Sequence, residues 1–199
     1  MRYLAIVLCL LAGTALSQTA TTTAGATAAV LADMTPQNTL ATVTADLNND
    51  GVADRAVLFR AGKEMDGALA IFDRGDPDRL ALFAPAIAWV GGLGQQPDLG
   101  VSPRGSLLVK SMNDSVGRER WFQTVTIAYR KGRYLLAGIT YDWYDTLDPA
   151  NTGTCDLNLL TGKGTLQKGE TGPATALRVS LRAMPPEDWD GALPPECFP

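Results

Sequence analysis

The stretch that decides the fold class runs from Arg120 to Trp143 and reads RWFQTVTIAYRKGRYLLAGITYDW. It is rich in β-branched and aromatic residues, and apolar and polar side chains alternate before the Lys131-Gly132 pair. Alternation with a period of two is typical of strands that bury one face. The stretch therefore predicts a β-hairpin, with Gly132 at a turn position that requires a positive φ.

The turn of this hairpin is expected to contain three residues, 130–132. A two-residue turn would place Arg130 directly opposite Arg133, where like charges repel. The longer turn also gathers Thr124, Thr126 and Thr140 on the face opposite the apolar residues. The expected pairs are Trp121 with Tyr141, Val125 with Ala137, and Ile127 with Leu135.

The rest of the chain from residue 40 onward also has the residue pattern of β-strands separated by turns. Short apolar runs are broken by Gly, Asp and Pro about every ten residues, which is typical of all-β domains. No segment carries a helical apolar stripe longer than two turns. We expect an all-β fold of antiparallel meander or sandwich-like sheets with little helix. The expected strands are 40–45, 55–60, 68–72, 80–83, 87–90, 106–111, 121–129, 134–143, 156–160, 164–166 and 176–182.

The N-terminus predicts export. Arg2 precedes an apolar run over residues 3–12, which is shorter than the roughly 20 residues that a bilayer span needs. The run resembles a secretory signal peptide cleaved after Ser17, and a retained anchor is the alternative. We expect a periplasmic or secreted protein without membrane insertion after cleavage. The expected organisation is a signal peptide at 1–17, a flexible Thr/Ala-rich leader at 18–34, a β-rich domain at 35–184 and a Pro-rich tail at 185–199.

Cysteine usage agrees with export. Cys9 leaves with the signal peptide, so the mature chain keeps Cys155 and Cys197. An even pair in an oxidising compartment favours a disulfide, here one that pins the tail, and two free thiols are the alternative.

Composition excludes several classes of function. The chain has no histidine, which removes Ser-His-Asp and Cys-His catalysis and histidine-ligated metal sites. The formal net charge is −4, and a nucleic-acid-binding protein needs a clustered basic face. We therefore expect no nucleic-acid partner, and any catalysis must use carboxylates, tyrosines, lysines or a hard cation.

A second informative stretch, ADLNNDGVADRAVLF, occupies residues 45–59. Its oxygen-bearing side chains recur at alternate positions, as the ligands of a calcium loop do. With Asp46 as the first position of such a loop, Gly51 is the sixth, where the loop requires glycine, and Val52 is the seventh, which donates its backbone carbonyl. An EF-hand requires Glu at the twelfth position, where this chain has Val57. A metal-free turn rich in Asn, Asp and Gly is the alternative. The candidate calcium ligands are Asp46, Asn48, Asp50, the Val52 carbonyl and Asp54.

This Asp-rich loop resembles the calcium loops of FG-GAP and VCBS repeats, the integrin-type propeller blades, over residues 43–72. The resemblance implies a calcium ion held by the five residues at 46, 48, 50, 52 and 54, between two strands. The loop has Asn48 where the repeats have Asp, and it occurs in one copy. A full propeller requires repetition, so none is expected. The rest of the chain resembles secreted bacterial proteins that carry this loop, which implies export and a β-rich fold.

Two other groups are candidates for ligand contact. Carboxylates and aromatic rings lie together at Asp142, Trp143, Tyr144 and Asp145, as in a sugar-binding or glycoside hydrolase site. The alternative is a strand end that enters a turn. The loop with Asn113 and Arg118 could contact a ligand, or it could be an ordinary hairpin connection.

We therefore expect an exported, non-catalytic binding or interaction protein with one structural calcium site. Its partner, an unknown protein or a glycan, is not specified by the sequence. One alternative is a histidine-free carbohydrate-active enzyme that uses Asp142 and Asp145. A further alternative is a structural component of the cell envelope.

Overall fold

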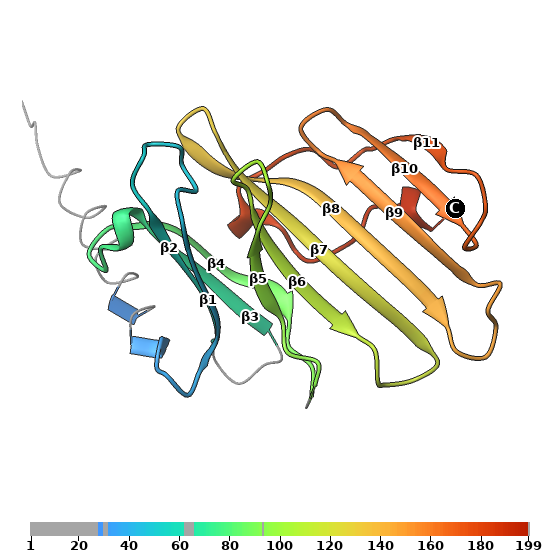
Figure 1. Cartoon of the computed structure of the whole chain (residues 1–199), viewed down its shortest axis with the longest axis horizontal. Helices are drawn as coiled ribbons and strands as arrows, with labels where there is room; N and C mark the ends of the chain where they lie inside the picture. Colours follow the sequence, from blue (N-terminus) through green and yellow to red (C-terminus); the bar gives the residue numbers. More distant parts are fainter. Residues whose placement is uncertain (1–27, 30–31, 62–65, 93, 199) are drawn as a thin grey trace, which may run out of the picture. The chain divides into compact units, whose positions relative to one another are not determined.

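The computed structural model describes residues 28–29, 32–61, 66–92 and 94–198, and it contains two antiparallel β-sheets (Figure 1). The chain divides into two units, residues 1–32 and 33–199, and both sheets belong to the second. Residues 28–29 and 32–33 have helical backbone. The expected signal peptide and most of the expected leader lie outside the described residues. The all-β prediction is confirmed, with neither a closed barrel nor a propeller in the described part.

The first sheet is a meander in which each strand pairs with the next along the chain. The expected strands 80–83 and 87–90 are a single strand, because a bulge near Pro85 replaces the expected break. Proline lacks an N–H, and it is tolerated at a bulge on an edge strand such as this one. The four strands are β1 (Thr39–Ala45), β2 (Asp54–Arg60), β3 (Asp66–Phe72) and β4 (Leu80–Trp89).

The second sheet is also a sequential meander, with β11 and β5 at its edges. The sequence did not predict β5, whose four residues follow a stretch rich in Gly and containing Pro97. Residues 179–182, expected to extend the last strand, lie outside it. The seven strands are β5 (Asp98–Val101), β6 (Leu107–Asn113), β7 (Glu119–Arg130), β8 (Arg133–Asp145), β9 (Thr152–Asn158), β10 (Lys163–Lys168) and β11 (Thr175–Arg178).

The predicted three-residue turn between β7 and β8 is wrong. Arg130 pairs directly with Arg133, and the turn consists of Lys131 and Gly132, with φ values of 53° and 82°. Two residues with positive φ match the right-handed twist of the strands, and the solvent around the exposed arginines weakens their repulsion.

A bulge between Thr126 and Ile127, with Ala137 as the extra residue on β8, shifts the pairing of the hairpin. The two faces are nevertheless as expected, since Thr124 lies opposite Thr140. The observed pairs are Trp121 with Trp143, Val125 with Ile139, and Ile127 with Leu136.

The two sheets share one hydrophobic core. Leu58 and Ile71 of the first sheet belong to the same buried cluster as Val125, Ile139 and Leu157 of the second. The sheets meet where β1 contacts β5 and β4 contacts β6. Removing this apolar surface from water is the main favourable term in folding.

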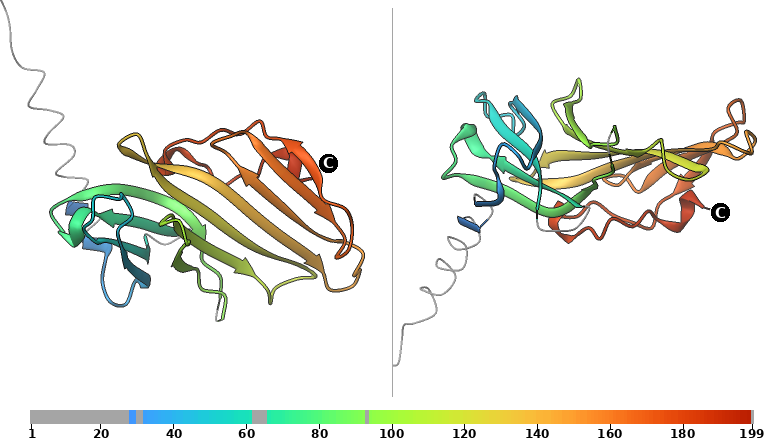
Figure 2. Two further views of the ribbon diagram at one scale, coloured as in Figure 1. Left: turned by 45° about the horizontal axis from the view of Figure 1, so that its top comes forward. Right: turned by 90° about the horizontal axis from the view of Figure 1, so that it is seen from below.

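The C-terminal segment runs along one face of the second sheet (Figure 2). It includes two short 3-10 helices, η2 (Pro186–Asp188) and η3 (Pro195–Cys197). Met184 forms a β-bridge with Leu136 of β8, and Trp189 is buried. The tail is therefore part of the folded domain.

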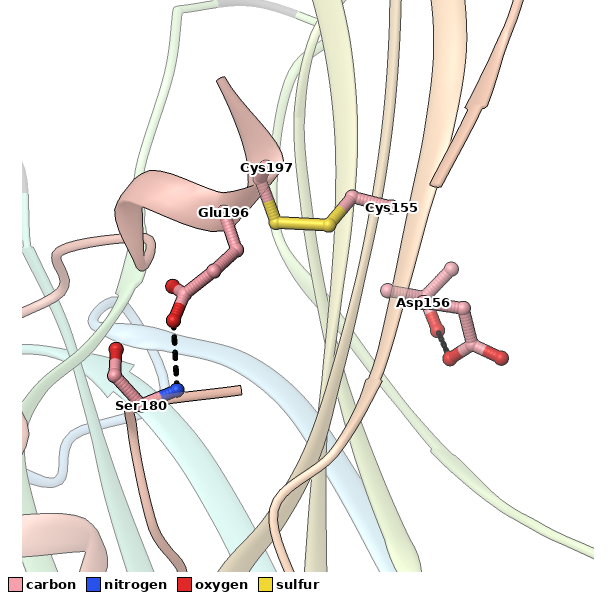
Figure 3. Close-up of a disulfide and its surroundings, with 6 residues drawn as sticks. Cys155, Asp156, Ser180, Glu196 and Cys197 are labelled. Carbon is pink, nitrogen blue, oxygen red and sulfur yellow. Dashed lines mark hydrogen bonds between the residues drawn. A yellow bond between two sulfur atoms is a disulfide. The ribbon is translucent and has the colours of Figure 1, made fainter. Parts of the chain in front are cut away.

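The predicted cysteine pair lies at disulfide distance (Figure 3). The two sulfur atoms are 2.07 Å apart and link Cys155 of β9 to Cys197 of η3. Next to this bridge, the Ser180 N–H donates to Glu196 Oε1 at 2.7 Å, and the pKa of that carboxyl is lowered by its bond with Ser180. The covalent bridge and this hydrogen bond hold the end of the tail against the sheet.

Candidate functional site

The Asp-rich loop connects β1 to β2 and bends sharply at two residues. Asn49 has a φ of 61° and Gly51 a φ of 85°. No atom lies within 4 Å of where a Cβ on Gly51 would stand. The backbone conformation, and not close packing, is therefore the reason for a glycine at this position.

The oxygens of three predicted ligands converge on the backbone of this loop. The Asp50 N–H donates to Asp46 Oδ1 at 3.1 Å and to Asn48 Oδ1 at 2.9 Å. The Gly51 N–H donates to Asp46 Oδ2 at 3.0 Å, and the Val52 N–H donates to Asp50 Oδ1 at 2.8 Å. The structure thus brings Asp46, Asn48 and Asp50 together around one tight turn.

The fifth predicted ligand, Asp54, is fully buried. Its Oδ2 accepts hydrogen bonds from the Leu47 N–H at 3.1 Å and the Tyr134 hydroxyl at 3.3 Å. Its Oδ1 accepts from the Arg74 N–H at 3.0 Å. A buried carboxylate needs such partners because desolvation of an unpaired charge is costly. Asp54 therefore ties the loop to the β3–β4 connection and to the second sheet.

A short 3-10 helix, η1 (Asp73–Gly75), forms the other side of the loop. Arg74 Nη2 lies 2.9 Å from Asp50 Oδ2, and Asn48 Nδ2 donates to Asp73 Oδ1 at 3.3 Å. The hydrogen bond from the Val52 N–H and the nearby Arg74 guanidinium lower the pKa of Asp50. The turn is closed by contacts from a different part of the chain.

Sequence reasoning missed these contacts from outside the loop. Arg74 lies 24 positions from Asp50, and Tyr134 lies 80 positions from Asp54. Neither residue belongs to a local motif. The pairing of β2 with β3 brings Arg74 beside the loop, and the contact between the two sheets brings Tyr134 there, so no signal in the sequence could have identified them.

A cleft of about 580 Å³ opens beside the Asp-rich loop. Asn48, Asp50 and Asp73 line one side, and Tyr129 and Tyr134 line another. The two tyrosine rings meet edge to face, with centroids 5.0 Å apart. Burial of Tyr134 raises the pKa of its hydroxyl, and the negative charge of Asp54 raises it further. The hydroxyl therefore stays protonated and donates a hydrogen bond to Asp54.

Of the other predicted ligand-contacting residues, Arg118 and Asp145 are brought together. Arg118 Nε donates to both oxygens of the nearly buried Asp145, at 3.0 and 2.8 Å. The Leu147 N–H donates to the same carboxylate at 2.9 Å. These hydrogen bonds lower the pKa of Asp145 to about 2, and the bond from Arg118 has the largest effect. The pair anchors the turn that follows β8.

Asp142 and Asp145 do not form a common site. Successive side chains of a strand alternate between its faces, so two positions three apart in β8 lie on opposite sides. Asp142 Oδ1 accepts a hydrogen bond from Thr154 Oγ1 at 2.6 Å. The ring of Tyr144 stacks on Phe122, and that of Trp143 stacks on Tyr141.

Asn113 closes the loop between β6 and β7. Its Nδ2 donates to the Val116 carbonyl at 2.9 Å, and its Oδ1 accepts from the Val116 N–H at 3.0 Å. Both ends of the side-chain amide are therefore used within the loop. Side chains of this type commonly stabilise turns in this way.

The Asp-rich loop contains oxygen atoms of the chemical type that a hard cation binds, and these oxygens accept hydrogen bonds from the loop backbone. Among the residues that the structure describes, no three His, Cys, Asp or Glu side chains form a metal-holding group. A cation at this loop would therefore need the Asn48 amide oxygen and the Val52 carbonyl in addition to Asp46 and Asp50. Carboxylate, amide and carbonyl oxygens are the ligands that calcium prefers.

No protein-family profile matches this chain, and comparison with curated proteins and with solved structures found no match. The resemblance of the Asp-rich loop to FG-GAP and VCBS repeats therefore stays a prediction. The function must be inferred from the geometry and chemistry of the candidate sites themselves.

Proposed function

We propose that this chain is an exported binding protein without catalytic activity, and that its Asp-rich loop holds one structural calcium ion. The observation that carries the proposal is the gathering of the side-chain oxygens of Asp46, Asn48 and Asp50 around one tight turn. The absence of catalysis is supported by Asp145, whose carboxylate is engaged by Arg118 and by the Leu147 N–H. A carboxylate held ionised in this way cannot act as a general acid near neutral pH.

The proposal of export rests on the N-terminal sequence and on the cysteine pair. Disulfides persist in oxidising compartments such as the periplasm and the extracellular space. Among the described helical segments, none has the length and apolar character of a membrane span. We therefore place the mature protein in the periplasm or outside the cell.

The proposed calcium ion would be held by the side chains of Asp46, Asn48 and Asp50 and by the Val52 carbonyl. Asp54 would act from beneath the loop, as the buried anchor that fixes its shape. The ion would neutralise the acidic turn and link its residues, a structural contribution. Extracellular calcium modules bind with dissociation constants on the order of 0.1–1 mM, and we expect an affinity in this range.

The rival enzyme hypothesis requires Asp142 and Asp145 to act on one substrate. Glycoside hydrolysis uses two carboxyl groups that flank the same bond. The positions of these two residues on opposite faces of β8 favour binding over hydrolysis. A purely structural envelope component is a third hypothesis, and it has no need of a ligand site.

Isothermal titration calorimetry with calcium tests the metal proposal. The native protein should bind one ion, and Asp50→Ala should remove the heat of binding. Asp148→Ala is a matched control, because Asp148 also accepts a backbone N–H in an exposed turn but lies outside the loop. Absence of binding by the native protein, or its loss in the control, would contradict the proposed site.

A hydrolysis screen tests the claim of no catalysis. The native protein is incubated with a panel of α- and β-linked polysaccharides, and the products are analysed by mass spectrometry. We expect every polysaccharide to remain intact. Turnover that disappears in Asp142→Asn or Asp145→Asn would support the enzyme hypothesis instead.

A further inference from the structure

The 3-10 helix η1 brings one carboxylate and one guanidinium to the Asp-rich loop. Asp73 Oδ1 accepts a hydrogen bond from Asn48 Nδ2 at 3.3 Å. Arg74 Nη2 lies 2.9 Å from Asp50 Oδ2. Asn48 and Asp50 are both candidate ligands of the proposed calcium ion. The two side chains of η1 therefore contact two of the groups that would hold the ion, without being candidate ligands themselves.

The position of η1 beside the loop is fixed by its own hydrogen bonds. The Asp73 N–H donates to the Arg79 carbonyl at 2.9 Å, and the Asp76 N–H donates to the Asp73 carbonyl at 3.1 Å. The guanidinium of Arg79 also pairs with Asp73 Oδ2. The Arg74 N–H donates to the buried Asp54 at 3.0 Å. The contacts between η1 and the loop are therefore a fixed part of the fold.

Asp73 determines which way the Asn48 amide points. A side-chain amide has one end that donates and one end that accepts. The Asn48 Nδ2 faces the Asp73 carboxylate, so its Oδ1 is directed to the Asp50 N–H, from which it accepts at 2.9 Å. A carboxylate in place of the amide would face Asp73 with a like charge. Asp73 is therefore a positioning residue that turns the Asn48 oxygen toward the loop.

Arg74 stands where the backbone favours glycine. Its φ is 55°, in the left-handed region that costs free energy for a residue with a Cβ. The side chain of Arg74 reaches back to the loop and pairs with Asp50. This ion pair gives a reason for an arginine at a position that glycine would occupy without strain.

The ion pair between Arg74 and Asp50 can open at little cost. The Arg74 side chain is 48% exposed and that of Asp50 is 31% exposed. Ion pairs at such exposed positions are weak, because water solvates both partners. The Val52 N–H still holds Asp50 Oδ1 at 2.8 Å. The carboxylate of Asp50 therefore keeps its place when the guanidinium leaves.

We propose that η1 controls cation binding at the Asp-rich loop: Asp73 positions Asn48, and Arg74 is an internal counter-ion that a divalent cation displaces from Asp50. This inference rests on the proposed calcium site and names the group that competes for it. Asp46 and Asp50 carry two negative charges, of which one guanidinium offsets one and a divalent cation offsets both. A monovalent cation brings no more charge than the guanidinium that it displaces, so the exchange selects a divalent ion.

A counter-ion and a brace differ in the sign of their effect on calcium affinity. A brace that holds Asp50 in place would strengthen calcium binding, and its removal would weaken it. A counter-ion competes with calcium for Asp50 and repels the incoming ion, so its removal strengthens binding. Removal of either would lower the stability of the protein in chelator. Calcium affinity therefore decides between the two roles of Arg74.

The test is isothermal titration calorimetry with calcium chloride on the full chain and its variants. Arg74→Gln should bind calcium about two- to fivefold more tightly than the native protein. In about 1 M sodium chloride the two affinities should converge, because salt screens exposed charges. Arg178→Gln is the control, since it removes one exposed arginine from β11 in the second sheet. Unchanged or weaker binding in Arg74→Gln, or an equal gain in the control, would overturn the counter-ion.

Two variants of Asp73 test its positioning role. Asp73→Ala removes the acceptor of the Asn48 amide and should weaken calcium binding about two- to tenfold. Asp73→Asn keeps a side-chain oxygen that can accept from Asn48, so it should restore most of the affinity. Both variants lose the negative charge that pairs with Arg79, so the difference between them isolates the acceptor. Equal calcium affinities in the two variants would overturn the positioning role.

The same titrations separate this inference from the proposed calcium site. Binding by the native protein without a gain in Arg74→Gln would overturn the counter-ion and leave the calcium site in place. Binding by Arg74→Gln alone would support the counter-ion and contradict a calcium ion held by the native protein. Absence of binding in both proteins would overturn both proposals.

Discussion

The Asp-rich loop and the start of β7 differ in how far the chain satisfies its own polar groups. In the loop, three donors engage the buried Asp54, and Asp50 accepts hydrogen bonds from Val52 and Arg74. At the start of β7, the Nε and Nη1 atoms of Arg120 are buried and have no hydrogen-bond partner among the described residues.

This difference shows which region is fixed by its own contacts. A network in which every member has a partner holds the backbone in one shape, which is a structural role. A buried donor without a partner costs stability. We therefore assign a structural role to the Asp-rich loop.

Removal of the disulfide should have the largest effect on stability. Cys155 and Cys197 are 42 positions apart, and closing a loop of this length stabilises the fold by about 4 kcal/mol in the chain-entropy model. Cys155→Ser combined with Cys197→Ser should lower the urea midpoint accordingly.

Calcium binding by the Asp-rich loop should persist in the double variant, because the bridge lies in the second sheet and the loop connects two strands of the first. A double variant with native stability would show that the tail is held by its other contacts alone.

Asp54→Ala should be the most damaging substitution in the Asp-rich loop. It leaves the N–H groups of Leu47 and Arg74 and the hydroxyl of Tyr134 without their acceptor, at a cost of roughly 3 kcal/mol. Asp50→Ala, at an exposed position, should cost much less than Asp54→Ala in the presence of a chelator, because solvent screens its ion pair with Arg74. Urea unfolding of both variants measures the difference, and equal losses would contradict the role of Asp54 as the anchor.

Acid should weaken the turn after β8. The pKa of Asp145 is about 2 in the folded protein, below its ordinary value of 3.8, chiefly because of Arg118. A lowered pKa gives stability that is fully present above about pH 4 and is lost as the pH falls toward 2. In Arg118→Gln, the NMR titration of the Asp145 carboxyl should move upward. An unchanged midpoint would show that the backbone N–H groups alone set this pKa.

The fold class could be predicted because strand periodicity is a local property. The alternation around Val125 and Ile127 identified the central hairpin, and Gly132 marked its turn. The register could not be predicted, because the bulge between Thr126 and Ile127 and the positive φ of Lys131 left no sign in the pattern. Strand β5 was missed because four residues beside a Gly-rich stretch give too weak a signal.

The candidate sites were predicted only where their residues are close in sequence. Asp46, Asn48 and Asp50 lie in one loop, and the structure gathers them. The roles of Arg74 and Tyr134 depend on contacts between distant strands. The row of aromatic rings at Trp89, Trp121, Tyr141 and Trp143 likewise combines β4, β7 and β8, so Trp143 was identified without its neighbours.

The smallest expected effect tests the structural role of the loop most directly. At 1 mM calcium and a dissociation constant of 0.1 mM, linkage adds about 1.4 kcal/mol to the free energy of unfolding. For a chain of this size, that gain raises the melting temperature by about 3–6 °C. We predict this rise for the native protein in calcium relative to chelator, and none for Asp50→Ala. Identical melting curves for the native protein in the two conditions would contradict a structural calcium ion in the Asp-rich loop.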